Sequence, residues 1–560
     1  MKFLILFAFL LSLCALNAQN PILIKDIVPG TGSSTIYVPE SSFTLDSLYF
    51  FLSTVQSQEN QYWMTDGTED GTKLLKPIEP IVGGSRFYHH TFKNIAYFLN
   101  YDFSIADGVR ELWRTDGTAE NTYKFLDTCN LYCSLQSNYI EYKNQILFTG
   151  FSSNGDELWI TDGTIQNTKL LKDIIPGAIG GLPQRFFEFN SIVYFSADNN
   201  GKNRELWQTD GTSVGTKILL DLNNNDSLGT DPIILGVYGN NLYFSAVGSV
   251  STGRELWKTD GTITGTNLVK DINTGSGDGV LNSSFAVIGN SLLFPAFDSI
   301  HGREWWLTDG TESGTRLLKE LINSNTFGSG FRIINATDSL VIFWINDLIH
   351  GPEMWRTDGT EGGTYLLKDI YPGSQGSLQS TTIYPNIKYK NRVFFPALDD
   401  VYGMEIWETD GTTAGTKRLT DMYYFNVFQD DSRKENFQII NNYLYFTAAT
   451  DEYGYEVWKL LIDTPVATQN PANPAQLNVE VYPNPNTGSF HFTGFLEKPS
   501  FMQARLLDLQ GRVLFTQQFE QIDGAFLRHI EAPQLPTGLY LLNIQTEQGT
   551  RTLPISIVKN

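Results

Sequence analysis

One short phrase, W-x-T-D-G-T, recurs along most of the chain and restricts what the chain can fold into. It occurs eight times, and a ninth copy, "YEVWKL" around Trp458, lacks the turn that follows. Neighbouring copies lie 46 to 52 residues apart, which suits a four-stranded unit and exceeds most helical repeats. A phrase repeated in this way is more often architecture than chemistry, because a catalytic motif usually occurs once. The tryptophans are Trp63, Trp113, Trp159, Trp207, Trp257, Trp306, Trp355, Trp407 and Trp458.

Each period contains four candidate strands. In the fourth unit they are "TKLLKDI" (168–174), "RFFEF" (185–189), "IVYFSA" (192–197) and "RELWQT" (204–209). No window shows a 3.6-residue apolar period, and 49 glycines with an aromatic content of 13% favour strands and turns over helices. The sequence therefore predicts an all-β fold.

The repeated units are expected to close into a ring. A four-stranded sheet with two apolar faces must stack on copies of itself, and radial stacking gives a β-propeller. The mature chain begins with an "LLKDI"-type strand that has no "ELW" strand before it, and the array ends with "YEVWKL", which has no such strand after it. Pairing 23–27 with 455–460 would build one composite blade. This predicts nine blades, with eight blades or an open solenoid as the alternatives.

The Asp-Gly of the phrase reads as a turn between two strands. Glycine accepts positive φ, as expected at Gly261, and the aspartate can accept hydrogen bonds from nearby backbone N–H groups. The tryptophan is expected to pack against the neighbouring unit. Calcium binding is the alternative interpretation of the loop. Calcium needs several oxygen ligands and the loop offers a single carboxylate, so no cofactor is predicted. The turn aspartates are Asp66, Asp116, Asp162, Asp210, Asp260, Asp309, Asp358 and Asp410.

The ends and the composition indicate export. The first 18 residues carry a basic residue, an apolar run and a small-residue cleavage site, which is the pattern of a signal peptide. No later run is long enough to span a bilayer, and the net charge of −22 argues against nucleic acid as a partner. Cys129 and Cys133 remain after cleavage and could form a local disulfide.

No nucleophile, metal or phosphate motif is found. His301 and His350 occupy the same place in adjacent units and could share a metal, although solvated loop positions are the preferred interpretation. The glutamates before each tryptophan are expected to pair with an arginine or lysine of a neighbouring strand, because a catalytic residue would break the repeat. They are Glu205, Glu255, Glu304, Glu353 and Glu405. The segment 420–437 is the least repeat-like and the best candidate for a local site.

The phrase resembles the bacterial ELWxxDGT repeat family over about residues 21–460. That resemblance implies a surface or secreted protein and supplies no catalytic residues. Residues 463–476 are rich in Pro, Thr, Asn and Ala and read as a linker.

Residues 477–560 resemble the C-terminal sorting domain of the type IX secretion system through "VYPNPNTGSF", "LLDLQGRVL" and "LPTGLYLLNI". This resemblance implies a small β-sandwich that directs cargo through the outer membrane of Bacteroidetes-type bacteria, with the secretion machinery as partner. The motif residues are Tyr482, Pro483, Asn484, Pro485, Gly488, Gly511, Gly538 and Tyr540.

These observations predict a signal peptide (1–18), a repeat propeller (19–462), a linker and a sorting domain. The leading functional hypothesis is a secreted or surface-anchored binding protein with a glycan or protein ligand. An enzyme on a propeller scaffold, acting on carbohydrate, is the alternative. A structural component of the envelope is a third reading.

Overall fold

The computed structural model describes most of the chain between residues 21 and 559. The described residues are 21–30, 32–34, 42–53, 61–76, 89–102, 109–130, 139–199, 203–222, 229–249, 251–281, 284–322, 331–337, 339–377, 386–422, 435–450, 452–463, 479–482, 487–508, 512–532, 534–546 and 549–559. The chain separates into two compact units, residues 1–463 and 464–560. Within the described residues strands are the only regular elements.

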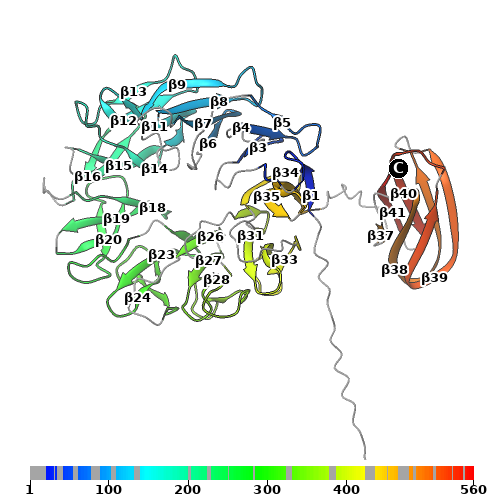
Figure 1. The fold of residues 1–560 in the computed structure, drawn as a ribbon. Helices are drawn as coiled ribbons and strands as arrows, with labels where there is room; N and C mark the ends of the chain where they lie inside the picture. The colour runs from blue at the N-terminus through cyan, green and yellow to red at the C-terminus, as the bar shows by residue number, and fades with distance from the viewer. Residues whose placement is uncertain are drawn as a thin grey trace, which may run out of the picture. The chain divides into compact units, whose positions relative to one another are not determined.

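The first unit contains, in its described part, nine four-stranded antiparallel sheets, each of which is a blade of a β-propeller (Figure 1). Eight blades are built from four consecutive strands. The first four comprise β2 (Phe43–Leu45), β3 (Leu48–Ser53), β4 (Gln61–Thr65) and β5 (Lys73–Leu74); β6 (His89–Phe92), β7 (Ile95–Asp102), β8 (Val109–Thr115) and β9 (Tyr123–Asn130); β10 (Tyr139–Tyr142), β11 (Gln145–Ser152), β12 (Gly155–Thr161) and β13 (Lys169–Lys172); and β14 (Gln184–Phe189), β15 (Ile192–Asp198), β16 (Arg204–Thr209) and β17 (Lys217–Leu220).

The next four blades repeat this order, and the ninth uses both ends of the unit. They comprise β18 (Ile233–Tyr238), β19 (Asn241–Ser249), β20 (Gly253–Thr259) and β21 (Asn267–Lys270); β22 (Ala286–Ile288), β23 (Ser291–Asp298), β24 (Gly302–Thr308) and β25 (Arg316–Lys319); β26 (Arg332–Thr337), β27 (Leu340–Asn346), β28 (Pro352–Thr357) and β29 (Tyr365–Leu366); and β30 (Ile387–Tyr389), β31 (Arg392–Asp399), β32 (Gly403–Thr409) and β33 (Lys417–Arg418). The ninth joins β34 (Glu435–Ile440), β35 (Tyr443–Thr450) and β36 (Gly454–Leu461) to β1 (Ile22–Lys25).

The ninth blade closes the ring with a strand from the other end of the unit. In the β1–β36 ladder Leu23 lies opposite Trp458 and Lys25 opposite Val457. Other hydrogen bonds join the two ends of the unit: the Ser34 N–H, for example, donates to the Tyr455 carbonyl at 3.0 Å, and Tyr49 Oη on β3 donates to the Asn436 carbonyl at 3.1 Å. The predicted composite blade is therefore confirmed, and the described residues form nine blades rather than eight.

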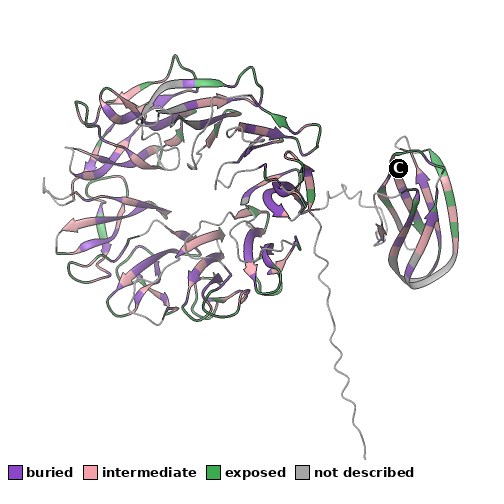
Figure 2. Cartoon of the chain, in the orientation of Figure 1, coloured by how far each residue is buried: buried purple, intermediate pink, exposed green. Residues whose placement is uncertain are grey.

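The first strand of each blade lies toward the centre of the ring and the fourth toward its rim (Figure 1). The core lies between blades, where both faces of each sheet are covered (Figure 2). Trp306 on β24, for example, packs with Leu235 and Tyr243 of the preceding blade. Trp355 on β28 packs in the same way with Leu293 of the blade before it. Each blade therefore buries its tryptophan against its predecessor, which fixes the order of stacking.

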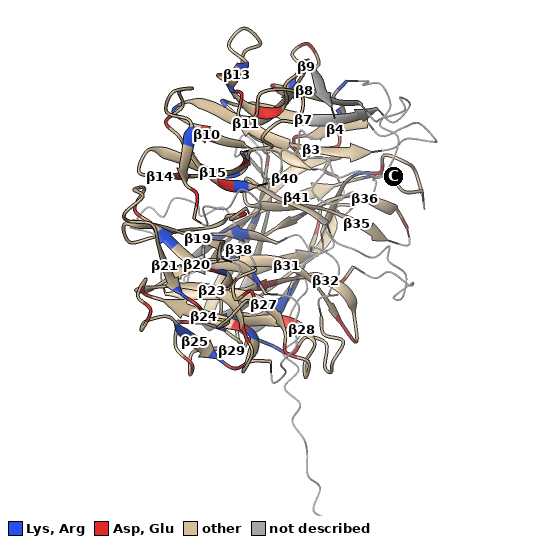
Figure 3. Ribbon diagram, turned by 90° about the vertical axis from the view of Figure 1, so that its left-hand side faces the viewer, with Lys and Arg blue, Asp and Glu red and all other residues tan. Residues whose placement is uncertain are grey.

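The charged residues lie mainly outside the apolar contacts between blades. Figure 3 shows lysine, arginine, aspartate and glutamate mainly toward strand ends and loops, while the middles of the strands are mostly uncharged. Lysines at the ends of the fourth strands reach across to the next blade. Lys270 Nζ donates to the Thr315 carbonyl at 2.8 Å, and Lys319 Nζ donates to the Thr364 carbonyl at 2.7 Å. These bonds add a polar link at the rim to the apolar contact between blades.

The second unit is a β-sandwich of five described strands: β37 (Val479–Tyr482), β38 (Ser489–Leu507), β39 (Val513–Glu531), β40 (Gly538–Thr546) and β41 (Gly549–Ile557). Alternate residues of the strands point inward, such as Leu542 and Ile544 on β40, which are fully buried. Pro554 lies on β41, the last strand in the sheet order, where a missing backbone donor is tolerated.

Several predicted features lie outside the described residues. The signal peptide (1–18) is one, and Cys133 is another, so the proposed disulfide stays a prediction; the backbone of Cys129 pairs with Arg110 in the β8–β9 ladder. No helix among the described residues is long and apolar enough to cross a membrane.

Ring closure can be tested by cross-linking in a background with Cys129 and Cys133 changed to serine. We expect Ile22→Cys and Lys459→Cys, which lie opposite each other in the β1–β36 ladder, to form a disulfide under mild oxidation, because opposed Cβ atoms in such ladders are about 5 Å apart. The bond should raise the melting temperature of the whole propeller. Ile22→Cys with Leu461→Cys, which is out of register, is the control, and equal cross-linking of both pairs would contradict closure by this ladder.

Candidate functional site

The repeated loop between the third and fourth strands is a closed network of hydrogen bonds. In the β18–β21 blade Asp260 Oδ1 accepts from the Thr262 N–H at 2.9 Å and from Thr262 Oγ1 at 2.7 Å. Thr262 Oγ1 in turn accepts from the Gly265 N–H at 3.0 Å. The hydrogen bonds from Thr262 hold the pKa of Asp260 below its usual range. The loop runs for seven residues, longer than a two-residue turn, and its carboxylate is engaged by its own threonine.

The second glycine of the loop is required by the aspartate. A Cβ on Gly265 would lie 2.0 Å from Asp260 Oδ1, and the same contact recurs at Gly71, Gly215, Gly314, Gly363 and Gly415. Two loops have asparagine at this place. There Asn121 Nδ2 donates to Asp116 Oδ2 at 2.6 Å and Asn167 Nδ2 donates to Asp162 Oδ2 at 2.7 Å. The asparagine therefore converts a steric conflict into a hydrogen bond.

The first glycine of the loop contacts the preceding blade. Gly310 has φ of +90°, and a Cβ there would lie 2.3 Å from the hydroxyl of Tyr243 on β19. The Gly310 carbonyl accepts from Lys258 Nζ of the same preceding blade at 2.9 Å. The D-G-T sequence thus turns the chain and also packs against the preceding blade, on Tyr243 at Gly310 and on Ile288 at Gly359.

The glutamates that precede the tryptophans are buried carboxylates that bind backbone amides. The expectation that they pair with arginine or lysine is wrong. Glu255 is fully buried and accepts from the Ile272 and Asn273 N–H groups at 2.9 and 3.3 Å. Glu353 accepts from the Tyr371 N–H at 3.0 Å, and Glu405 from the Met422 N–H at 2.9 Å.

Each of these glutamates lies in the third strand of its blade. It binds the segment of chain that follows the fourth strand. Glu157, Glu304 and Glu456 accept backbone N–H groups in the same way, and Glu205 accepts from Thr230 Oγ1; all four are at most 1% exposed. The arginine next to Glu205 in the chain, Arg204, instead donates to the Leu182 carbonyl at 2.8 Å. Burial raises the pKa of Glu255, Glu304 and Glu456 to about 8.

Three loops at the end of the strands opposite to the D-G-T loops share one structure. They join the second and third strands of the β22–β25, β26–β29 and β30–β33 blades, at residues 298–302, 347–351 and 399–403. Each begins with a buried aspartate whose Oδ1 accepts two backbone N–H groups, as Asp347 does from Ile349 and His350 at 3.0 and 2.7 Å. Each then exposes an aliphatic side chain: Ile300 and Val401 are 72% exposed and Ile349 is 70% exposed.

The two histidines singled out by the sequence lie in these loops. His301 Nδ1 is 2.8 Å from Asp298 Oδ2, and His350 Nδ1 is 2.6 Å from Asp347 Oδ2. The bond to Asp347 raises the pKa of His350. Tyr402 takes the same position in the third loop. The histidines are about one third exposed and each is held by its own aspartate.

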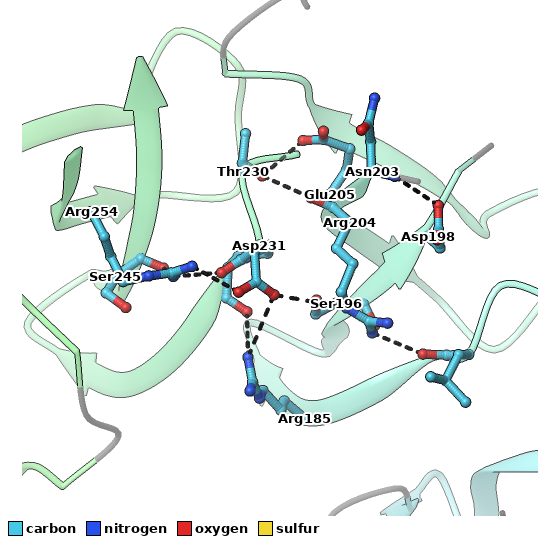
Figure 4. A network of polar contacts seen from close by, with 12 residues as sticks. Arg185, Ser196, Asp198, Asn203, Arg204, Glu205, Thr230, Asp231, Ser245 and Arg254 are labelled. Carbon is cyan, nitrogen blue, oxygen red and sulfur yellow. Dashed lines mark hydrogen bonds and ion pairs between the residues drawn. The ribbon is translucent and has the colours of Figure 1, made fainter. Parts of the chain in front are cut away.

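A further polar cluster was missed by the sequence reasoning. Arg185, Arg204 and Arg254 converge on Asp231 where the β14–β17 and β18–β21 blades meet (Figure 4). The available signal was departure from the repeat, since Leu182 and Val280 stand where Asp231 does. Most of the segment 420–437, the site candidate from sequence, lies outside the described residues. In the described part of the chain, no three His, Cys, Asp or Glu side chains are grouped as metal ligands would be.

The sorting-motif residues are partly described. Tyr540 is buried on β40 and its hydroxyl donates to the Pro536 carbonyl at 2.9 Å. Gly538 begins that strand, Gly488 has φ of +98°, and the backbone of Tyr482 pairs with His491. Pro483, Asn484, Pro485 and Gly511 lie outside the described residues.

Comparison with known proteins identifies this second unit. Residues 480–558 match the family model of the secretion system C-terminal sorting domain. This unit is a type IX sorting domain. The match covers only this part of the chain, and it supports secretion or an outer-surface location. None of the curated proteins matches the chain.

Two solved structures are similar to the chain in fold alone. A puromycin hydrolase mutant complexed with PGG has 11% identity and a TM-score of 0.37, over 64% of this chain and 58% of that chain. A structure from a study of two prolyl endopeptidases has 9% identity and a TM-score of 0.37, over 66% of this chain and 55% of that one. The chain therefore spans little more than half the length of either, and likenesses this weak carry no argument about activity.

The loop network predicts that asparagine can replace its second glycine better than alanine can. Gly265→Ala should lower the free energy of unfolding by about 1–3 kcal/mol, as overpacking does, because its Cβ meets Asp260. Gly265→Asn should cost less, because its amide can donate to Asp260 as Asn121 and Asn167 do to their aspartates. Gly362→Ala is the control, since nothing lies within 4 Å of its Cβ. Equal losses for Ala and Asn in denaturant unfolding would contradict this account.

The buried glutamates predict a stability that falls as pH rises. With a folded pKa of about 8 against an ordinary value of 4.5, Glu255 keeps a proton that the unfolded chain has lost. The stabilisation is complete below about pH 4.5 and is lost as pH rises through 8. We expect the melting temperature to fall between about pH 5 and 8, and the fall to be shallower in Glu255→Gln. Glu312→Gln, in an exposed loop, is the control; identical slopes for both variants would count against protonated glutamates.

Proposed function

We propose that the chain is an exported binding protein whose propeller contacts a glycan or protein ligand outside the cell. The sorting domain supports the export, and the loops at 298–302, 347–351 and 399–403 support the binding. Calcium at the D-G-T loops stays an untested hypothesis, and the mature protein is proposed to be released or held at the cell surface.

The observation that carries the binding proposal is the exposure of Ile300, Ile349 and Val401. Aliphatic side chains gain nothing for folding when they stand in water, and on three loops with a fixed backbone they offer apolar area to a ligand. The buried aspartate at the start of each loop fixes the backbone before binding, which lowers the entropy lost when a ligand is bound. The loops belong to three consecutive blades and point to the same face, because each joins a second to a third strand.

Export can be tested by deleting residues 477–560. The truncated protein should remain in the periplasm, because the predicted signal peptide provides passage across the inner membrane only. Cell fractionation and assay of the medium, with the full-length chain as the control, give the readout. Unchanged surface or medium levels of the truncated protein would refute the proposed route.

Binding can be tested on glycan arrays and a panel of purified extracellular proteins with the full-length chain. We expect Ile300→Ser/Ile349→Ser/Val401→Ser to lower the affinity for whichever ligand binds by tenfold or more, because its apolar contacts are removed. The control is Ile165→Ser/Val214→Ser/Ile263→Ser, which alters aliphatic residues that are 51%, 93% and 62% exposed in loops at the other end of the strands.

Equal losses in the two triple variants, or no loss in either, would contradict the assignment of the binding face. Chemical turnover of a bound saccharide or peptide would instead support the enzyme alternative.

A further inference from the structure

The arginine cluster lies at the end of the strands where the first and third strands of two neighbouring blades begin. Arg185 is on β14 and Arg204 begins β16, while Asp231 precedes β18 and Arg254 is the second residue of β20 (Figure 4). Residues of both blades therefore meet at one junction, near the first strands that face the centre of the ring.

Two of the arginines have a structural task that recurs in both blades. Arg204 Nη2 donates to the Leu182 carbonyl at 2.8 Å, and Arg254 Nη1 donates to the Asp231 carbonyl at 2.6 Å. Leu182 and Asp231 are equivalent, since both have positive φ and both donate their N–H to the start of the third strand of the preceding blade. These contacts tie the incoming chain to its blade and would do so without any acidic side chain at Asp231.

Arg185 and Asp231 are not explained by the repeat. The blade registers place Ile234 and Ile333 where Arg185 stands, and the backbone bonds place Leu182 and Val280 where Asp231 stands. Arg185 also lies in a β-bulge with φ of +60°, a conformation that costs free energy for a long side chain. Arg185 thus stands at a position that is apolar in the β18–β21 and β26–β29 blades and is held by Asn436, also with positive φ, in the ninth blade; Asp231 stands at a position that is apolar in the blades on either side.

The charges at the junction are unbalanced in favour of the cations. Asp231 Oδ2 is 2.7 Å from Arg254 Nη2, whereas Oδ1 is 3.9 Å both from Arg185 Nη1 and from Arg204 Nε. The second carboxylate close by, Asp198, accepts from the Asn203 N–H at 3.0 Å. Three guanidinium groups therefore face two carboxylates.

A third acidic group near the cluster, Glu205, carries only part of its charge, and Asp221 lies close to it. Burial raises the pKa of Glu205 to about 7, and its carboxyl accepts from Thr230 Oγ1 at 2.8 Å. Because Glu205 is only partly charged near neutral pH, the three arginines carry more charge than Asp231 and Asp198, the two carboxylates beside them.

Arg185 is the most exposed of the three arginines, and the carboxylate of Asp231 beside it is 46% exposed. Its side chain is 36% exposed, against 17% for Arg204 and 9% for Arg254. Its hydrogen bond, from Nη1 to the Pro232 carbonyl, is long at 3.4 Å. The planar guanidinium thus presents donors to solvent, while the two buried arginines contribute positive charge behind it.

We propose that this junction is a binding site for an oxyanion, a carboxylate or a sulfate group, carried by an extracellular polysaccharide. Arg185 donates to the anion as a planar fork, and Arg204 and Arg254 supply the field. Asp231 holds the three guanidinium groups together. On a chain with net charge of −22, a local excess of positive charge selects where an anion can approach. Anion binding here does not require the loops at 298–302, 347–351 and 399–403, so the two proposals can fail separately.

The test measures binding of three probes to the full-length chain by surface plasmon resonance at two salt concentrations. Polygalacturonate carries carboxylates, dextran sulfate carries sulfates and dextran is neutral. We expect at least one anionic polymer to bind more tightly than dextran, and Arg185→Gln to weaken that binding tenfold or more. Arg185→Lys, which keeps the charge and loses the fork, should give an intermediate loss. Arg316→Gln removes an equal charge from an exposed strand position and should change affinity less than twofold.

The outcomes separate the sources and the failures. Binding of only one anionic polymer supports the site and identifies the group as carboxylate or sulfate, and binding of both supports recognition of an oxyanion in general. Anionic polymers that bind no better than dextran, or equal losses in Arg185→Gln and Arg316→Gln, would overturn the proposal. The melting temperature of each variant is measured in parallel, and retention of the wild-type value by Arg185→Lys shows that lost affinity is not lost folding.

Discussion

The fit between neighbouring blades is the constraint on which the rest of the structure depends. Each four-stranded sheet has two apolar faces, so neither face can be left to water, and a ring is the arrangement that covers them all. The tryptophan of each unit fills one side of this interface, as Trp306 does against Leu235 and Tyr243. The D-G-T loop secures the same interface at the end of the strands, where Gly310 lies under Tyr243. The repeated phrase therefore encodes the contact between neighbouring blades and occurs once in each blade.

This interface also explains the buried glutamates. A chain that passes from the last strand of one blade to the first strand of the next must leave backbone N–H groups without ladder partners. Glu255 accepts two of these groups, at Ile272 and Asn273. The same position in the composite blade is Glu456, which accepts from the Val28 N–H and from Ser34, more than four hundred residues earlier in the chain. The residue that organises an ordinary connection thus also fastens the N-terminal segment to the last blade.

The features of the fold that could be predicted are those that depend on short sequence patterns. The period, the Asp-Gly turns and the unmatched strands at the two ends led to nine blades with a composite closure, and the structure confirms that arrangement. The partners of the glutamates could not be predicted in the same way. Almost every residue has a backbone N–H group, so the sequence does not show which ones a glutamate binds, whereas a basic residue such as Arg204 is an evident candidate partner. The junction of Arg185 with Asp231 joins positions on different blades, and only the aligned registers show that both depart from the repeat.

Departure from the repeat is the most useful guide to function in a chain of this kind. A residue present in every blade, such as the loop aspartate or the buried glutamate, is explained by its role in building the blade. A charged residue found in one blade, at a position that is apolar in neighbouring blades, is not explained by that role. Arg185 meets this description and also carries the cost of a positive φ. The exposed loops at 298–302, 347–351 and 399–403 form an intermediate case, because three consecutive blades share them, which suits a surface that contacts an extended ligand. On this reasoning the symmetric residues build the ring, and the asymmetric ones are where its ligands should be sought.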